Sequence, residues 1–226
     1  MKYHDILWHE EKGIVYLVNL RNASRCARDF LVQENFEHVT NFKTINPLAK
    51  EVPYEKLRKL DSFFCNIRHP KERIVRGLAA AVVSSSTLAE QFLSLNLDAS
   101  SKTVNGYFES NPVAWLKIFH DWHVYPVSYH YEEFLDKLFP LPLNENYELD
   151  NTVRPYLKTK GLEIRRIEQR HATGSIMKQI QDKFREIINS EQGNKFYKEF
   201  LAPWYQKDLE LYHRSLENIR EIHDKT

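Results

Sequence analysis

The stretch DSFFCNIRHPKERIVRGL, residues 61–78, passes from an apolar run into a helical pattern. Residues 62–67 form the apolar run, which is typical of a β-strand that is covered on both faces. Pro70 suits the first turn of a helix, because the backbone N–H has no helical partner there. The sequence therefore predicts a strand over 62–67 followed directly by a helix over 70–95. Four cationic side chains gather at this junction: Arg68, Lys71, Arg73 and Arg76.

The same order of elements occurs nearer the N-terminus. Residues 14–20 are β-branched, aromatic and almost continuously apolar, which predicts a buried strand. Residues 21–35 follow with apolar side chains at helical spacing, and Asn22 or Ser24 suits the N-cap. Residues 36–45 alternate well enough for a further strand. Alternating strands and helices favour an α/β fold with a central, mainly parallel sheet.

The rest of the chain has fewer clear signals. A polar loop is expected at 98–106, helices at 111–122 and 132–139, a short strand at 124–131, and an irregular stretch at 139–151. From Ser175 onward the pattern is helical almost to the end. No stretch resembles a linker between domains, so we expect one domain over residues 1–226 with a long helical C-terminal segment.

The overall charge of the chain is close to neutral. Thirty-two basic residues oppose 31 acidic ones, which disfavours nucleic acid or an anionic membrane as partner. Cys26 and Cys65 are far apart in the sequence, which argues against a zinc knuckle or a disulfide framework. The N-terminus lacks the apolar core of a signal peptide, and residues 13–20 are too short to span a bilayer. We therefore expect a soluble, cytoplasmic protein.

Cations also gather after the first predicted strand, where Arg21, Arg25 and Arg28 recur at helical spacing. In a parallel sheet, the ends of both strands lie at the carboxyl edge, beside free helix N-terminal amides that bind anions. Two such corners suit two phosphate groups on one ligand. For Arg28, Lys71 and Arg73 there is an alternative: they are solvated surface charges or ion-pair partners of Asp29 and Glu72.

These two corners resemble motifs of the sulfotransferase family, whose members take a sulfuryl group from 3′-phosphoadenosine 5′-phosphosulfate. Residues 66–78 are similar to the 3′-phosphate motif, a strand that ends in Arg-x-Pro-x-x-Arg and a later Ser. Arg68, Pro70 and Arg73 match this pattern, while Arg76 stands in place of the Ser.

Residues 18–31 are similar to the 5′-phosphosulfate loop of the family, Pro-Lys-x-Gly-Ser-Thr-Ser. Ser24 matches, while the other aligned residues depart from it or fall at the variable position: Arg21 for Lys, Asn22 at x, Ala23 for Gly and Arg25 for Thr. Residues 124–138 resemble the strand that ends in Tyr-Glu before a helix, and 201–212 the closing helix with its Tyr-x-x-Asp. The resemblance spans about residues 13–213.

The resemblance implies a P-loop-like three-layer fold and in-line transfer of a sulfuryl group to a hydroxyl or amine of a small-molecule or carbohydrate acceptor. Residues 21–25, Arg68, Arg73 and Arg76 would hold the donor, and Arg21 would also act in catalysis, with no metal required. A general base is expected among His120 and His123, with Asp121 able to orient an imidazole; His38 is a third candidate. Histidines that cap a helix end explain the same cluster.

Two other functions remain open at this point. The first is a sulfotransferase-like protein that binds a nucleotide or another anion without catalysis. It fits the departures at Arg21, Arg25 and Arg76, because a guanidinium differs in shape and chemistry from the ammonium or hydroxyl of the family motif. A P-loop kinase is disfavoured, since the chain lacks the G-x-x-x-x-G-K-[ST] loop that wraps phosphates.

Overall fold

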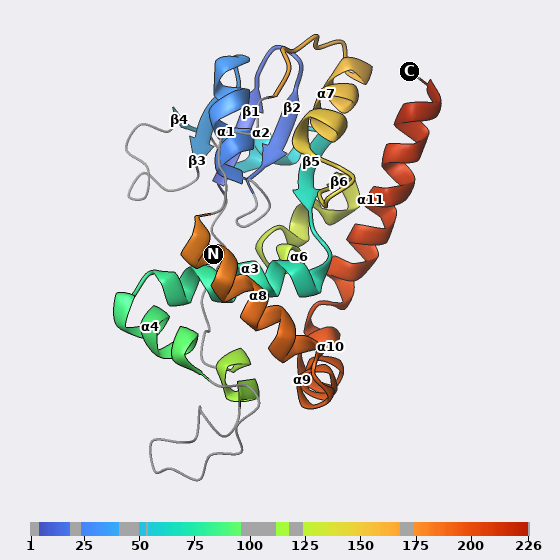
Figure 1. The fold of residues 1–226 in the computed structure, drawn as a ribbon. Helices are drawn as coiled ribbons and strands as arrows, with labels where there is room; N and C mark the ends of the chain where they lie inside the picture. The colour runs from blue at the N-terminus through green and yellow to red at the C-terminus, as the bar shows by residue number, and fades with distance from the viewer. Residues whose placement is uncertain are drawn as a thin grey trace. The chain divides into compact units, whose positions relative to one another are not determined.

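The computed structural model describes residues 5–18, 24–40, 50–52, 54–95, 112–117, 124–167 and 174–225 (Figure 1). The chain divides into two compact units. Unit 1 comprises Met1–His69, Pro126–His171 and Lys207–Thr226, and unit 2 comprises Pro70–Tyr125 and Ala172–Gln206. Each unit is described by itself, and the organisation of residues 1–226 as one domain stays a prediction.

Unit 1 contains a six-stranded mixed sheet in the order β4-β3-β1-β2-β5-β6. Parallel pairs are β2 with β5, β5 with β6, and β3 with β4, whereas β1 is antiparallel to both β2 and β3. The bounds of the strands are Asp5–His9 (β1), Ile14–Leu17 (β2), Glu37–Thr40 (β3), Lys50–Glu51 (β4), Ser62–Ile67 (β5) and Leu138–Pro142 (β6). The α/β class is thereby confirmed.

Strand β1 was not predicted, and it makes the sheet mixed. It forms a hairpin with β2, closed by a turn in which the Gly13 N–H donates to the Glu10 carbonyl oxygen (3.2 Å). Gly13 has φ of 62°, a left-handed conformation that glycine adopts without steric cost. The predicted strand 14–20 corresponds to β2, and the predicted strand 62–67 coincides with β5.

Helices cover both faces of this sheet. On one face, α1 (Ser24–Gln33), α7 (Leu149–Thr159) and the end of α11 (Gln206–Lys225) pack on side chains such as Tyr16 and Phe64. On the other face, α2 (Tyr54–Arg58), α6 (Val127–His130) and the 3₁₀ helix η2 (Glu132–Lys137) pack on Val15 and Phe63. Alternate residues of each strand thus enter different cores, as the two-residue period of a strand requires.

Three predictions between residues 124 and 151 were wrong. The expected strand 124–131 contains α6 instead, the expected helix 132–139 is the 3₁₀ helix η2 running into β6, and the expected irregular stretch 139–151 contains most of β6 and the start of α7. Strand β6 lies at the edge of the sheet. An edge strand tolerates Pro140 and Pro142, whose missing N–H groups would interrupt a central ladder.

Unit 2 is helical. The predicted helix 70–95 is two helices, α3 (Pro70–Val83) and α4 (Ser86–Ser94), because the Ser85 side chain caps the start of α4. The C-terminal helical prediction is confirmed by α8 (Ser175–Asn189), α9 (Glu191–Phe196), the π-helix η3 (Tyr197–Leu201), α10 (Ala202–Trp204) and then α11. The predicted helix 111–122 is a 3₁₀ helix, η1, at Pro112–Leu116, and its remainder lies outside the described residues.

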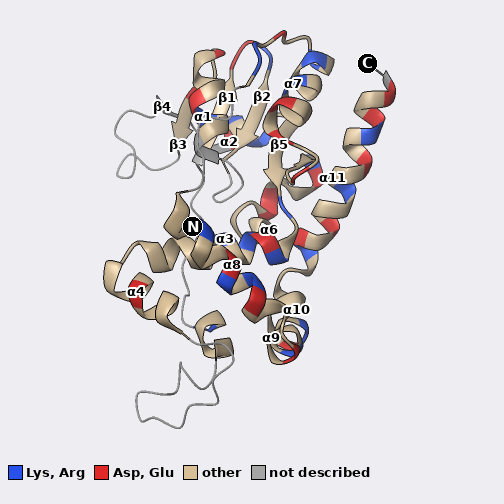
Figure 2. Ribbon diagram, viewed as in Figure 1, with Lys and Arg blue, Asp and Glu red and all other residues tan. Residues whose placement is uncertain are grey.

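The core of unit 2 joins these helices. Stacked Phe92 and Phe184, with ring centroids 4.2 Å apart, connect α4 to α8, and Trp115 of η1 packs edge-on against Phe92. Among the described helices, none is both long enough and apolar enough to cross a membrane. Figure 2 shows Lys and Arg as well as Asp and Glu along both α8 and α11, so neither helix carries charge of one sign.

Candidate anion-binding edge of the sheet

The carboxyl ends of β2, β5 and β6 lie at one edge of the unit 1 sheet, which we call the carboxyl edge. Strands β2 and β5 are parallel neighbours with Tyr16 opposite Phe64, and β5 and β6 are parallel neighbours with Ile67 opposite Pro142. Residues that follow parallel neighbouring strands lie at the same edge, where α/β proteins commonly bind ligands. Val18, directly after β2, and Arg68, directly after β5, therefore lie at the same edge.

The chain directly after β2 is held by Tyr131, a residue of the segment 124–138. The Tyr131 hydroxyl donates to the carbonyl oxygen of Val18 at 2.5 Å, and Tyr131 is buried. Helix α1 then begins at Ser24, which is therefore its first residue and not its N-cap; Asn22, the other predicted N-cap, lies outside the described residues. The predicted site residues Arg21, Asn22 and Ala23 lie outside the described residues. Ser24 and Arg25 are the first two residues of α1, and their side chains are not described.

The end of β5 carries Arg68 and His69, both half-buried. The His69 ring lies edge-on to the ring of Tyr212 in α11, with centroids 5.4 Å apart. The Tyr212 hydroxyl in turn accepts a hydrogen bond from Nδ2 of Asn144 (3.1 Å), which follows β6. The carboxyl edge thus combines a guanidinium, an imidazole, a phenol and an amide.

Helix α6 is attached to α11 by a buried carboxylate. Asp208 accepts hydrogen bonds from the backbone N–H groups of Val127 (2.7 Å) and Ser128 (2.9 Å), and it is 1% exposed. These two N–H groups have no partner within a helix that starts there, so the carboxylate satisfies them from outside. Asp208 is the Asp of the Tyr-x-x-Asp motif seen in the sequence, and its observed contacts are structural.

Arg73, predicted to bind the donor, lies in unit 2 and is 1% exposed. Its Nη1 donates to the backbone carbonyl oxygens of Val124 (3.3 Å) and Tyr125. Two carbonyl dipoles compensate the buried charge in part, and the guanidinium holds the chain directly after the predicted base region. The expectation that Arg73 is a solvated surface charge is therefore not met.

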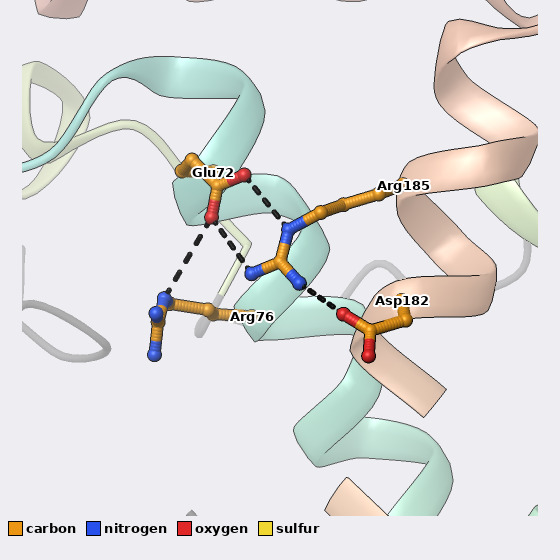
Figure 3. A network of polar contacts seen from close by, with 4 residues as sticks. All are labelled: Glu72, Arg76, Asp182 and Arg185. Carbon is orange, nitrogen blue, oxygen red and sulfur yellow. Dashed lines mark hydrogen bonds and ion pairs between the residues drawn. The ribbon is translucent and has the colours of Figure 1, made fainter. Parts of the chain in front are cut away.

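Arg76, also predicted to bind the donor, belongs to a charged network between α3 and α8 of unit 2 (Figure 3). Glu72 accepts two hydrogen bonds from Arg185, at Nε (3.0 Å) and Nη2 (3.1 Å), and forms an ion pair with Nε of Arg76 at 3.9 Å. Asp182 pairs with Arg185 from the opposite side at 2.6 Å. The hydrogen bond to Glu72 raises the pKa of Arg185 above its ordinary value, against an opposing effect of burial.

The two remaining cations of the clusters have protein partners. Arg28 pairs with Asp29 at 3.9 Å, as the surface-charge interpretation predicted. Lys71 donates to the side-chain oxygen of Asn194 (3.3 Å) and lies 4.8 Å from the centre of the Tyr197 ring. Neither contact indicates a ligand.

Two of the three predicted general bases lie outside the described residues. These two are His120 and His123, and their neighbour Asp121 also lies outside the described residues. His38, the third candidate, is in β3 opposite Leu7 and is half-buried. Among the described residues, no group of three or more His, Cys, Asp or Glu could hold a metal ion.

Sequence reasoning identified Arg68 but not Asn144 or Tyr212. Asn144 follows β6, whose two prolines led the sequence to predict an irregular stretch. Its position at the carboxyl edge becomes visible only through the pairing of β6 with β5. Tyr212 is one of many aromatic residues in the C-terminal helical segment, and only its hydrogen bond with Asn144 distinguishes it from the others. Comparison of the chain with models of protein families, with curated proteins and with solved structures finds no match.

Proposed function

We propose that this chain is a sulfotransferase that moves a sulfuryl group from 3′-phosphoadenosine 5′-phosphosulfate to a hydroxyl or amine of a small-molecule or carbohydrate acceptor. The observation that supports it best is the parallel pairing of β2 with β5, since the two motifs that resemble the donor site follow these neighbouring strands. The proposal includes a P-loop-like arrangement of unit 1, a cytoplasmic setting, and no metal.

The proposed reaction breaks the bond between sulfur and the bridging phosphate oxygen and forms a bond from sulfur to the acceptor oxygen or nitrogen. The acceptor proton passes to a base, for which His120 and His123 are the candidates, and the leaving group is 3′-phosphoadenosine 5′-phosphate. Transfers of this kind depend on positioning and charge stabilisation. Arg21 would stabilise the charge on the leaving phosphate, and Arg68 would bind the 3′-phosphate with bidentate, charge-assisted bonds.

A second candidate function, nucleotide or anion binding without catalysis, is favoured by the contacts in unit 2. Arg73 bonds to main-chain carbonyl oxygens and Arg76 pairs with Glu72. Both residues thus have protein partners at positions where the resemblance implies a bound phosphate. Arg68 and residues 21–25 would then hold the nucleotide, and the Arg21 guanidinium in place of the family's ammonium would not support transfer.

Calorimetry and a transfer assay together test both candidates. We expect 3′-phosphoadenosine 5′-phosphate to bind the full chain, and ATP with magnesium to bind more weakly. Transfer of labelled sulfate to a panel of sugars, phenols and amines would support the sulfotransferase. Binding without transfer to any acceptor would favour the second function. Tight binding of ATP with magnesium in place of 3′-phosphoadenosine 5′-phosphate would contradict the sulfotransferase and favour a kinase.

A further inference from the structure

The phenol of Tyr212 has a hydrogen to donate at the carboxyl edge. The orientation of the Asn144 amide determines where this hydrogen points. Oδ1 of Asn144 accepts hydrogen bonds from the backbone N–H groups of Asn146 (2.8 Å) and Tyr147 (3.0 Å). Those groups only donate, so the oxygen must face them and Nδ2 must face Tyr212. The amide therefore donates to the Tyr212 oxygen, and the hydroxyl hydrogen of Tyr212 points to another acceptor.

None of the described residues supplies that acceptor. Within the part of the chain that the structure describes, the Tyr212 hydroxyl donates to no protein atom, and its one side-chain hydrogen bond is the one it accepts from Asn144. Tyr212 is half-buried, and its ring contacts the ring of His69, the residue next to Arg68. A hydrogen-bond donor thus contacts His69, which directly follows Arg68, the residue to which the proposed function assigns a phosphate.

The position of Tyr212 is held firmly along β6. Nη2 of Arg214 donates to the carbonyl oxygen of Leu138 (2.7 Å), and Nδ2 of Asn218 donates to that of Pro140 (3.0 Å). Together with Asp208 at the N-terminal end of α11, these bonds fix the helix against the strand. A donor held in place before a ligand arrives loses little conformational entropy when the ligand binds.

We propose that Tyr212 is a further nucleotide-binding residue, whose hydroxyl donates to a phosphate oxygen of the ligand at the carboxyl edge. This inference rests on the proposed nucleotide site and adds to it a residue outside both motifs. Asn144 is a positioning residue that keeps the phenol hydrogen directed to the ligand, and the imidazole of His69 supports the ring. A phosphate suits this donor because its oxygens only accept hydrogen bonds at neutral pH.

The test compares binding of 3′-phosphoadenosine 5′-phosphate with binding of 5′-AMP, by calorimetry at fixed ionic strength. Tyr212→Phe removes the hydrogen and keeps the ring, and we expect it to weaken binding of the first nucleotide about tenfold, as for loss of one hydrogen bond to a charged group. A loss for that nucleotide alone assigns the bond to the 3′-phosphate, and a loss for both assigns it to the 5′-phosphate. The control is Tyr147→Phe, since that half-buried hydroxyl makes no hydrogen bond with a described residue.

Asn144→Asp supplies a second, independent variant. The carboxylate still accepts the two backbone N–H groups of its turn, but it also accepts from Tyr212 and so occupies the phenol hydrogen. We expect weaker nucleotide binding in the natural background and little added effect in the Tyr212→Phe background, which separates hydrogen-bond loss from simple charge repulsion.

The outcomes separate this inference from the proposed function. Unchanged binding by Tyr212→Phe, with a thermal midpoint equal to that of the natural chain and with binding lost in Arg68→Ala, would overturn the role of Tyr212 and leave the nucleotide site standing. Failure of the natural chain to bind either nucleotide would overturn both.

Discussion

Among the described residues, each of the two units has an acidic or basic side chain that is almost fully buried, and the two charges have opposite signs. In unit 1, Asp208 accepts hydrogen bonds from the N–H groups of Val127 and Ser128; in unit 2, Arg73 donates to the carbonyl oxygens of Val124 and Tyr125. Both are 1% exposed. Asp208 thus binds the backbone N–H donors directly after Pro126, and Arg73 binds the backbone carbonyl acceptors directly before it.

The comparison shows that a charged residue within a motif does not identify a ligand site. Arg73 and Arg68 belong to the same Arg-x-Pro-x-x-Arg stretch, yet Arg73 is buried on main-chain carbonyl groups while Arg68 is half-buried at the end of a parallel strand. Burial therefore separates Arg73, which the main chain holds, from Arg68, which stays the candidate binding residue.

The largest effect is expected from Arg73→Ala. The change leaves a buried and a partly buried carbonyl group without their donor and opens a cavity, so we expect the free energy of unfolding to fall by about 3 kcal/mol. Urea denaturation followed by circular dichroism measures this loss. Arg28→Ala, which removes an exposed ion pair, is the control and should cost less than about 0.5 kcal/mol.

The outcome also decides the role of Arg73. A variant with the stability of the natural chain but without nucleotide binding would show that Arg73 binds the donor, as the sequence motif suggested, and would remove the contrast with Arg68.

Asp208→Asn should have a smaller effect than Arg73→Ala. The amide oxygen can still accept from one of the two N–H groups, but its NH₂ group then faces the other donor, so we expect a loss of about 2 kcal/mol. Denaturation of the two variants under one set of conditions ranks them. A larger loss for Asp208→Asn than for Arg73→Ala would reverse the expected order and make the carboxylate the stronger anchor.

The next effect concerns binding rather than stability. Arg68→Ala should weaken binding of 3′-phosphoadenosine 5′-phosphate at least about tenfold, because a charge-assisted bidentate contact is lost. Arg28→Ala should leave binding within about twofold. Calorimetry on both variants measures the difference, and equal, negligible changes would mean that the carboxyl end of β5 is ordinary surface.

Sequence patterns predicted those elements whose signals are local. Strand β5 and the start of α3 coincide with their predictions, because an apolar run and Pro70 mark the junction without help from distant residues. Residues 124–131 failed for the opposite reason: alternating apolar side chains suggest a strand, but Asp208, 80 or more residues away, supplies the cap that makes Val127 the start of a helix.

The candidate site divides in the same way. The position of Arg68 at the carboxyl edge was predictable, since it depends only on where one strand ends. The donor hydrogen of Tyr212 was not, because it follows from the amide orientation of Asn144, which in turn depends on a turn after an edge strand that contains two prolines. No pattern within either segment indicates that the two side chains meet.

The smallest effect is expected in the network of Figure 3, which is partly open to solvent. Glu72→Gln keeps the size of the side chain but removes the charge that Arg185 and Arg76 share. The Glu72 side chain is 42% exposed, so solvent screening limits the loss to about 0.5–1 kcal/mol at low ionic strength. Denaturation at low salt and in about 0.5 M NaCl should show this difference shrinking as the salt rises.

Asp182→Asn is the matched control, because Asp182 contacts only one of the two arginines, with its carboxylate 52% exposed. The Glu72 variant also tests the binding function of Arg76. If Arg76 binds a phosphate, removing its acidic partner leaves its charge available and should strengthen nucleotide binding, whereas Asp182→Asn should not. Unchanged binding in both variants would place Arg76 with Arg73 among the structural cations of unit 2, and would leave Arg68 as the residue of that motif with a role in binding.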